Sequence, residues 1–161
     1  MERAIFAAGC FWGVQYYFDQ VPGVISSSAG YTGGHTDEPT YEQVCSHTTG
    51  HAEAVELEFD SSLVSYRELC QHFFRMHNPT QLNRQGPDYG DSYRTGIFYV
   101  SEMQKSTAEQ ALEAAQPNFD EPIVTEISAA TTFWPAEDYH QKYTEKTGRG
   151  MCHIPYEPLA A

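Results

Sequence analysis

Hydrophobic and polar residues alternate most regularly in the stretch that ends at Phe59. Val55 and Leu57 share its apolar side, whereas Glu56 and Glu58 occupy the intervening positions. A period of two predicts a β-strand that buries one face and exposes the other to water. This stretch is the clearest strand signal in the chain, and it sets the phase in which the residues before it are interpreted.

Flanking residues define the other predicted elements. Ser65 and Ser101 are followed three residues later by Glu68 and Gln104, the spacing of a capping box at a helix start. Proline and glycine mark several segment ends. The other predicted strands cover residues 4–8, 24–31, 95–100 and 123–128. The predicted helices follow residues 10, 65 and 101, and a short one covers 135–143. Residues 30–40 and 81–92 are predicted loops, and the pattern leaves the type of 41–45 open.

Up to Val100 the predicted order is strand, helix, strand, strand, helix, strand. This is the split βαβ order of ferredoxin-like domains, so we expect a two-layer α+β sandwich with a mixed or antiparallel sheet. An extra helix and strand decorate that core. At 161 residues the chain fits a single domain. We expect a core at about residues 3–128 and a flexible, irregular C-terminal tail at about 145–161.

The strand alternation extends backwards to a carboxylic acid. Glu53 is in phase with Val55, which places it on the apolar face. Burial of a carboxyl group disfavours its charged form and raises its pKa, so Glu53 is a candidate general acid at neutral pH. The alternative is that the strand begins only at Ala54, which would leave Glu53 in a surface loop.

A reactive cysteine is predicted where the first strand meets the first helix. Cys10 lies between Gly9, which lets the chain turn, and a segment that has helical spacing. Thiols at helix N-termini ionise more easily and are reactive. The alternative is a buried structural cysteine. Phe11 and Trp12 cannot both face one side of a helix, so at least one of them is expected to line whatever Cys10 faces.

Composition narrows the classes of partner. The net charge is −13, with 22 acidic and 9 basic residues, which argues against binding to nucleic acid or an anionic membrane. The chain has no apolar stretch of membrane-spanning length and no signal-peptide pattern at its start. We therefore expect a cytoplasmic protein with reduced thiols, although the chain can also be one module of a longer protein.

The cysteines and histidines do not predict a metal centre. Cys10, Cys45, Cys70 and Cys152 form no C-x-x-C pair and no zinc-ligand spacing. Cys70 falls on the apolar stripe of a helix and is predicted to be a core thiol. Two histidines, at positions 47 and 51, are four residues apart, but the Thr-Thr-Gly between them breaks a helix. We expect no metal and no cofactor.

Three kinds of group remain for chemistry. They are the thiols of Cys10 and Cys152, the acid Glu53, and phenols in or beside the loops. The phenols are Tyr31, Tyr41, Tyr89 and Tyr93. A thiolate, a neutral acid and phenol donors suit the reduction of an oxygen bound to sulfur. A cysteine-dependent acyl transferase would need a histidine beside the thiol. A non-enzymatic module that binds methionine-bearing peptides through its aromatic residues is the third possibility.

Several segments closely resemble the A-type peptide methionine sulfoxide reductases. The resemblance begins at Gly9-Cys10-Phe11-Trp12-Gly13 and covers nearly the whole chain. The other similar segments, in family order, are residues 39–45, 50–53, 83–94 and 136–141. The resemblance implies a ferredoxin-like α+β fold. It also implies reduction of the S epimer of methionine sulfoxide, free or in proteins.

The resemblance assigns roles to the polar residues. Cys10 matches the nucleophile, and Glu53 matches the acid that protonates the sulfoxide oxygen. Tyr41 and Tyr93 match the phenols that hydrogen-bond this oxygen. Cys152 matches the resolving cysteine, which forms a disulfide with the nucleophile before thioredoxin regenerates the thiols. The family also implies a monomer.

The resemblance also extends to the substrate pocket, but the chain departs from the family pattern in its recycling cysteines. Phe11 and Trp12 match the aromatic pocket for the ε-methyl group, and Asp88 matches a polar residue of the substrate site. Many family members carry a second recycling cysteine shortly after the first. Here no cysteine follows Cys152. A single Cys10–Cys152 exchange is therefore expected in place of a three-thiol relay.

Overall fold

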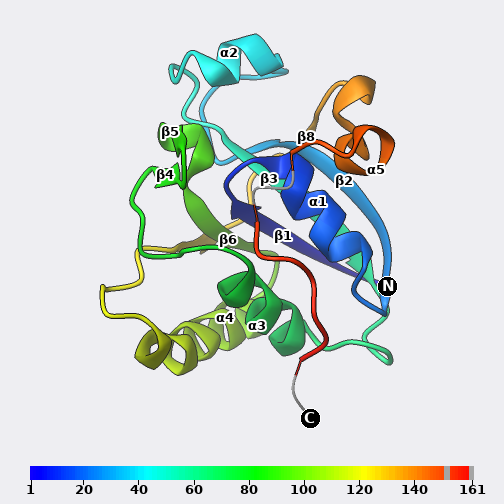
Figure 1. Ribbon diagram of the computed structural model, residues 1–161, viewed down its shortest axis with the longest axis vertical. Coiled ribbons are helices and arrows are strands. Elements are labelled where there is room, and N and C mark those ends of the chain that lie inside the picture. Colours follow the sequence, from blue (N-terminus) through cyan, green and yellow to red (C-terminus); the bar gives the residue numbers. More distant parts are fainter. Residues whose placement is uncertain (151–152, 160–161) are drawn as a thin grey trace.

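The computed structural model describes residues 1–150 and 153–159, which form a sheet covered by helices (Figure 1). The strands are β1 (Glu2–Ala8), β2 (Val24–Thr32), β3 (Ala52–Phe59), β4 (Arg84–Gln85), β5 (Asp88–Tyr89), β6 (Thr95–Tyr99), β7 (Glu126–Ala129) and β8 (Trp134–Pro135). The α-helices are α1 (Phe11–Asp19), α2 (Tyr41–Cys45), α3 (Tyr66–Met76), α4 (Glu102–Ala115) and α5 (Tyr143–Thr147). Three 3₁₀ turns among these residues are η1 (Asp91–Tyr93), η2 (Gln116–Asn118) and η3 (Asp138–His140).

The main sheet of the described residues has the strand order β7-β6-β1-β3-β2-β8. Its four central strands, β6-β1-β3-β2, are antiparallel and follow the ferredoxin-like order. β7 adds a parallel strand at one edge, and β8 adds a short antiparallel strand at the other. The predicted α+β fold with a mixed sheet is therefore confirmed.

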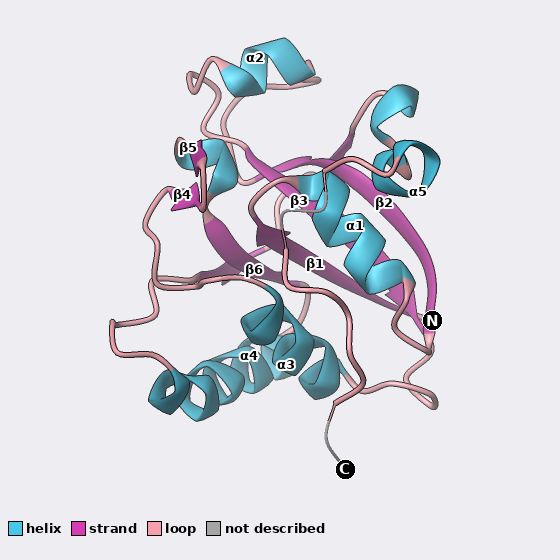
Figure 2. Cartoon of the chain, in the orientation of Figure 1, coloured by secondary structure: helices cyan, strands magenta, loops and turns pink. Residues whose placement is uncertain are grey.

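The helices α1, α3 and α4 cover one face of the sheet (Figure 2). Aromatic side chains make up much of the buried core between them. Phe6 of β1 stacks on Phe18 of α1 and on Phe73 of α3, with ring centroids 5.1 and 5.3 Å apart. A second, smaller cluster includes buried Ile5 and Phe98, and the partly buried Phe133 packs against it. The helical layer thus anchors β1 firmly, and β1 leads directly to Cys10.

The predicted start of α3 is confirmed in atomic detail. The Ser65 hydroxyl accepts a hydrogen bond from the Glu68 N–H, and the Glu68 carboxylate accepts one from the Ser65 N–H. The cap of α4 is only half of this motif. Ser101 accepts from the Gln104 N–H, but the Gln104 side chain instead accepts a hydrogen bond from the Val100 N–H. No helix of the described residues is long and apolar enough to cross a membrane.

The predicted loop over residues 81–92 was wrong in part. Arg84 and Gln85 pair with Tyr89 and Asp88 in a two-stranded hairpin, and η1 follows it. The Arg84 guanidinium also lies 4.6 Å from the centre of the Tyr89 ring. The hairpin is too short to show a strand period, so the sequence pattern could not reveal it.

One predicted strand and one predicted helix also differ from the structure. The last predicted strand begins only at Glu126, because the Val124 N–H donates to the Pro79 carbonyl instead of joining β6. The helix predicted over residues 135–143 is absent from the described chain. Pro135 pairs with β2, and Lys142 adopts a left-handed conformation that interrupts a helix. The helix α5 follows, within the segment expected to be irregular.

Candidate active site

The strand β1 leads into α1 (Figure 1). Cys10 lies between the buried end of β1 and the first turn of α1. It is partly exposed and occupies the N-cap position of the helix. Unpaired N–H groups and the positive end of the helix dipole favour a thiolate at such a position. The predicted location at a strand end and helix start is confirmed, and the alternative of a fully buried cysteine is wrong.

The carboxyl group of Glu53 lies beside the first turn of α1. Glu53 is 2% exposed, and its Oε1 accepts a hydrogen bond from the Phe11 N–H at 3.1 Å. β3 begins at Ala52, so Glu53 lies within the strand and shares its buried face. The predicted phase is confirmed, and the surface-loop alternative is wrong. The N–H of the residue after Cys10 thus fixes the position of the acid.

The environment of Glu53 keeps its proton in place at neutral pH. Burial raises the pKa of Glu53 to about 8. The Phe11 N–H acts in the opposite direction, and the charge of Asp88 raises the pKa further. Because burial is the largest of these effects, the group is a neutral acid at pH 7 and can donate a proton to a bound substrate.

Two phenols approach the same place from different elements. Tyr41 is the first residue of α2, and Tyr93 is the last residue of η1. Burial is the main cause that raises the pKa of each phenol, and the charge of Glu53 raises both as well. The charge of Cys10 acts on Tyr93 too. Both hydroxyl groups therefore stay protonated and are available as hydrogen-bond donors close to Glu53.

Trp12 forms the exposed part of an aromatic wall. Its indole N–H donates to Nδ1 of His140 at 2.8 Å, and its ring stacks on Tyr143 with centroids 4.0 Å apart. Phe11 is fully buried, and its ring lies behind Trp12 and Tyr41. Of the two aromatic residues in the Cys10 motif, only Trp12 therefore presents surface to a ligand.

Sequence reasoning missed three residues of this cluster. Glu137 accepts hydrogen bonds from the Tyr31 hydroxyl at 2.9 Å and from the Tyr41 N–H at 3.1 Å. His140 is 1% exposed and positions Trp12, while Cys45 lies against the Tyr41 phenol. All three belong to segments that carry the family resemblance, which was the available signal. Their contacts join distant segments, so spacing alone could not reveal them.

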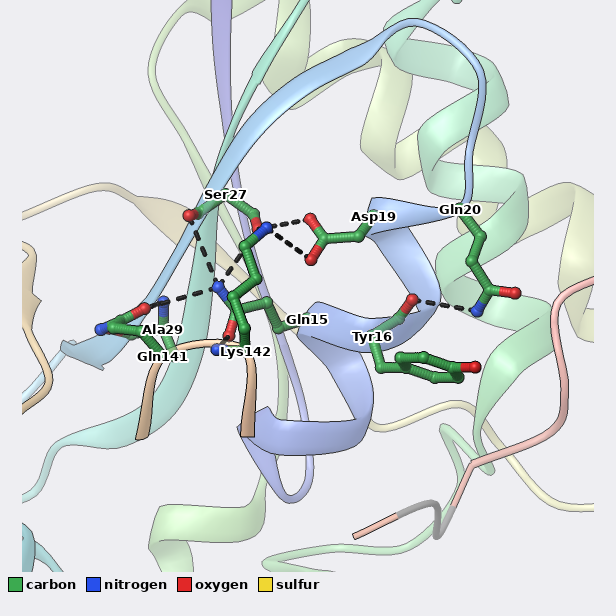
Figure 3. A network of polar contacts seen from close by, with 8 residues as sticks. All are labelled: Gln15, Tyr16, Asp19, Gln20, Ser27, Ala29, Gln141 and Lys142. Atoms are coloured by element: carbon green, nitrogen blue, oxygen red, sulfur yellow. Dashed lines mark hydrogen bonds and ion pairs between the residues drawn. The ribbon is translucent and has the colours of Figure 1, made fainter. Parts of the chain in front are cut away.

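A polar network holds the segment that carries His140 against α1 and β2 (Figure 3). The Gln141 side chain accepts a hydrogen bond from the Ala29 N–H and donates one to the Ala29 carbonyl, both at 2.9 Å. Next to it, the Lys142 N–H donates to Gln15 at 2.8 Å, and the Lys142 ammonium group pairs with Asp19 at 2.7 Å. These contacts fix the aromatic wall relative to Cys10.

Replacement of Gln141 by alanine is expected to lower the free energy of unfolding by about 2 kcal/mol, because buried Ala29 loses both side-chain partners. Urea denaturation at pH 7 measures this effect. As the control, Gln110→Ala on the exposed face of α4 is expected to change stability by less than about 0.5 kcal/mol. Equal stability of the two variants would contradict a structural role for the Gln141 contacts.

The other predicted site residues have different positions. Asp88 lies in β5, partly buried, and its charge acts on both Glu53 and Tyr93. Cys152 lies outside the described residues. The ring nitrogens of His51 both bond backbone groups, at Gly34 and Thr36. Among residues 1–150 and 153–159, no group of three or more metal-ligating side chains is present.

A cysteine at a helix N-terminus, a neutral acid and two phenols define a thiol-dependent redox site. The family described as Peptide methionine sulfoxide reductase matches residues 2–161 of the chain. The Peptide methionine sulfoxide reductase MsrA of Geobacter sulfurreducens is 55% identical over 154 residues, which cover 94% of this chain and 95% of that protein.

Solved structures agree with the sequence comparison. Mxr1 from Saccharomyces cerevisiae in reduced form superposes with a TM-score of 0.91 at 31% identity, over 97% of this chain and 92% of that one. Methionine sulfoxide reductase A of Corynebacterium diphtheriae superposes with a TM-score of 0.88 at 35% identity, over 92% and 76% of the two chains. The chain therefore belongs to the peptide methionine sulfoxide reductase family, a family of oxidoreductases.

Proposed function

We propose that the chain reduces the S epimer of methionine sulfoxide, free or in proteins, to methionine, and so repairs oxidised proteins. One observation carries most of this proposal. A buried and protonated Glu53 is hydrogen-bonded to the N–H that directly follows Cys10. A nucleophilic thiol and a proton donor therefore lie next to each other, as the cleavage of a sulfur–oxygen bond requires.

In the first step the Cys10 thiolate attacks the sulfoxide sulfur, and Glu53 gives its proton to the sulfoxide oxygen. The phenols of Tyr41 and Tyr93 donate hydrogen bonds to this oxygen as negative charge develops on it. Two electrons pass from the thiol to the substrate, and the sulfur–oxygen bond breaks. Methionine leaves, and Cys10 is left as a sulfenic acid that carries the oxygen.

In the second step the Cys152 thiol condenses with the Cys10 sulfenic acid. A disulfide forms, and the oxygen leaves as water. Thioredoxin then reduces the disulfide by thiol–disulfide exchange. The yeast relative Mxr1 has been solved in complex with Trx2, which supports a thioredoxin as the reductant. This cycle needs no metal or other cofactor, and it fits the reducing conditions of the cytoplasm, where we place the protein.

Trp12 is the proposed wall of the pocket for the ε-methyl group, with Phe11 supporting it from within the core. Asp88 is the proposed polar contact at the rim of the pocket. A flat aromatic surface suits a methyl group on sulfur, and the polar groups remain on the side of the oxygen. This arrangement would orient the sulfoxide with its oxygen towards Glu53.

The direct test is the mass of the reduced protein after it is mixed with methionine sulfoxide in the absence of a reductant. Loss of two hydrogen atoms, mapped to a Cys10–Cys152 linkage, is the expected result. Gain of one oxygen atom on Cys10 would support the first step but remove Cys152 as its partner. An unchanged mass, with folded protein and reduced thiols, would overturn the proposed reaction.

Replacement of Cys152 by serine is expected to separate the two steps. One equivalent of methionine should still form per enzyme, while thioredoxin-dependent turnover falls by about 100-fold or more. Methionine release and NADPH oxidation, coupled through thioredoxin reductase, measure these quantities. Cys70→Ala is the matched control because Cys70 is a fully buried core thiol. Normal thioredoxin-dependent cycling of Cys152→Ser would show that another thiol resolves the sulfenic acid.

A further inference from the structure

The described chain on both sides of residues 151–152 packs against the same glycine. A methyl group placed on Gly13 would lie 2.8 Å from the Gly150 carbonyl oxygen and 2.3 Å from Nδ1 of His153. Both distances are far below ordinary van der Waals contact. Gly13 lies in the first turn of α1, three residues after Cys10. The absence of a side chain at position 13 therefore makes room for Gly150 and His153, the described residues on either side of positions 151–152.

The His153 ring is held in this place by a specific hydrogen bond. Its Nε2 donates to the Ala8 carbonyl at 2.6 Å, at the end of the strand that leads to Cys10. Because a carbonyl only accepts, Nε2 carries the proton and Nδ1 faces Gly13. Burial lowers the pKa of His153, so the imidazole is neutral at pH 7. Packing against Gly13 and one hydrogen bond to the Ala8 carbonyl, rather than charge, therefore hold the ring in this position, which we call the His153 seat.

The C-terminal residues, red in Figure 1, run past α1 and α3 and make further contacts with both helices. The Ile154 N–H donates to the Met76 carbonyl at 3.0 Å. The Tyr156 ring packs edge-on against Tyr17, with ring centroids 5.5 Å apart. Arg75 donates to the carbonyl of Pro158 at 3.3 Å. These contacts hold residues 154–158 on α1 and α3. The His153 hydrogen bond, in contrast, reaches the carbonyl of Ala8, which lies two residues before Cys10 in the chain.

We propose that His153 is a positioning residue for the recycling step, seated between Gly13 and the Ala8 carbonyl so that the neighbouring Cys152 thiol meets the sulfenic acid on Cys10. This inference rests on the proposed function, because it concerns the second step of that reaction. The step joins the two sulfur atoms and releases the oxygen as water, without another oxidant or reductant. His153 takes no part in this bond exchange and acts only through the placement of the chain.

The experiment follows both steps in a single turnover of the reduced full-length protein with methionine sulfoxide and no thioredoxin. Methionine formation measures the first step, and loss of titratable thiols measures disulfide formation. His153→Leu keeps a similar volume but removes the N–H donor. We expect a normal methionine burst and disulfide formation slowed by about 10- to 100-fold, because misplaced reactants lose their proximity. The sulfenic acid should accumulate and be trapped by dimedone.

Three variants distinguish positioning from a general structural effect. His153→Gln retains a side-chain N–H donor of similar reach and is expected to restore much of the disulfide rate. Gly13→Ala blocks the seat while alanine favours the helix, so it should slow the second step and leave α1 folded. His35→Leu, at an exposed histidine, is the control and should behave like the wild type.

The outcomes separate the two proposals. Wild-type disulfide rates in both His153→Leu and Gly13→Ala would overturn the role of His153. A rate lowered equally in His153→Leu and His153→Gln would also overturn it, because the N–H donor would then be irrelevant. Failure of the wild-type protein to form methionine would instead overturn the proposed function. Formation of methionine without a Cys10–Cys152 disulfide in the wild type would overturn the proposed resolving step.

Discussion

Replacement of Cys10 by serine is expected to reduce turnover by at least about 1,000-fold, to the background level. Serine keeps the shape of the side chain, but its hydroxyl remains protonated at neutral pH and does not reduce a sulfoxide. The helix N-terminus that favours a thiolate cannot compensate for the loss of sulfur. Methionine formed from methionine sulfoxide, with thioredoxin or with dithiothreitol as the reductant, measures this loss.

The control for this variant is again Cys70→Ala. The Cys70 thiol is fully buried in α3, and burial raises its pKa to about 12, so it stays protonated and unreactive. Its removal tests whether any cysteine substitution harms the enzyme through folding alone. Activity of folded Cys10→Ser close to that of the wild type would refute the proposed nucleophile. Loss of activity in both variants would point to damaged folding instead.

Replacement of Glu53 by glutamine is expected to slow methionine formation in the first turnover by about 100- to 10,000-fold. Glutamine can keep the hydrogen bond from the Phe11 N–H, but it has no acidic proton to give. The wild-type rate is expected to fall as the pH rises through about 8, because Glu53 then loses its proton. The residual rate of the variant should lack this fall.

The same substitution has a pH-dependent effect on stability. The pKa of Glu53 is about 8 in the folded protein and about 4.5 in the unfolded chain. Between these two pH values the folded state still holds the Glu53 proton, whereas the unfolded state has lost it. The stability of the wild type therefore declines as the pH rises through this window. Between these pH values, the free energy of unfolding of Glu53→Gln should increase relative to that of the wild type by about 1.4 kcal/mol per pH unit.

Urea denaturation of both proteins between pH 5 and pH 9 measures this slope. Glu58→Gln is the matched control, because Glu58 lies on the exposed face of the same strand. It should show no comparable slope relative to the wild type. A pH-independent difference between Glu53→Gln and the wild type would contradict a neutral Glu53. A first-turnover rate and pH profile equal to those of the wild type would remove Glu53 from the acid role.

Local patterns predicted those parts of the site that depend on neighbouring residues. The alternation that ends at Phe59 gave the phase of Glu53, because successive side chains in a strand point to opposite faces. The apolar run before Gly9 and the helical spacing after it located Cys10 at a junction. Both predictions needed only a few consecutive residues, and the observed β1, α1 and β3 agree with them.

Predictions failed where contacts between distant segments decide the structure. The segment from Pro135 to Tyr143 has a helical composition, yet the pairing of Pro135 with β2 and the Gln141 contacts with Ala29 place it differently. These partners are about a hundred residues away along the chain. Intrinsic helix preference amounts to only a few tenths of a kcal/mol per residue, so such contacts override it.

The sequence by itself determined the order of the six core elements β1, α1, β2, β3, α3 and β6, the strand phase of Glu53 and, through its similar segments, the family. Only the tertiary structure decided that the Phe11 N–H holds the Glu53 carboxyl, that His140 orients Trp12, and that His153 fits against Gly13. Strand and helix patterns arise from interactions within a few residues. The geometry of the site arises from hydrogen bonds and packing between segments that only the folded sheet brings together.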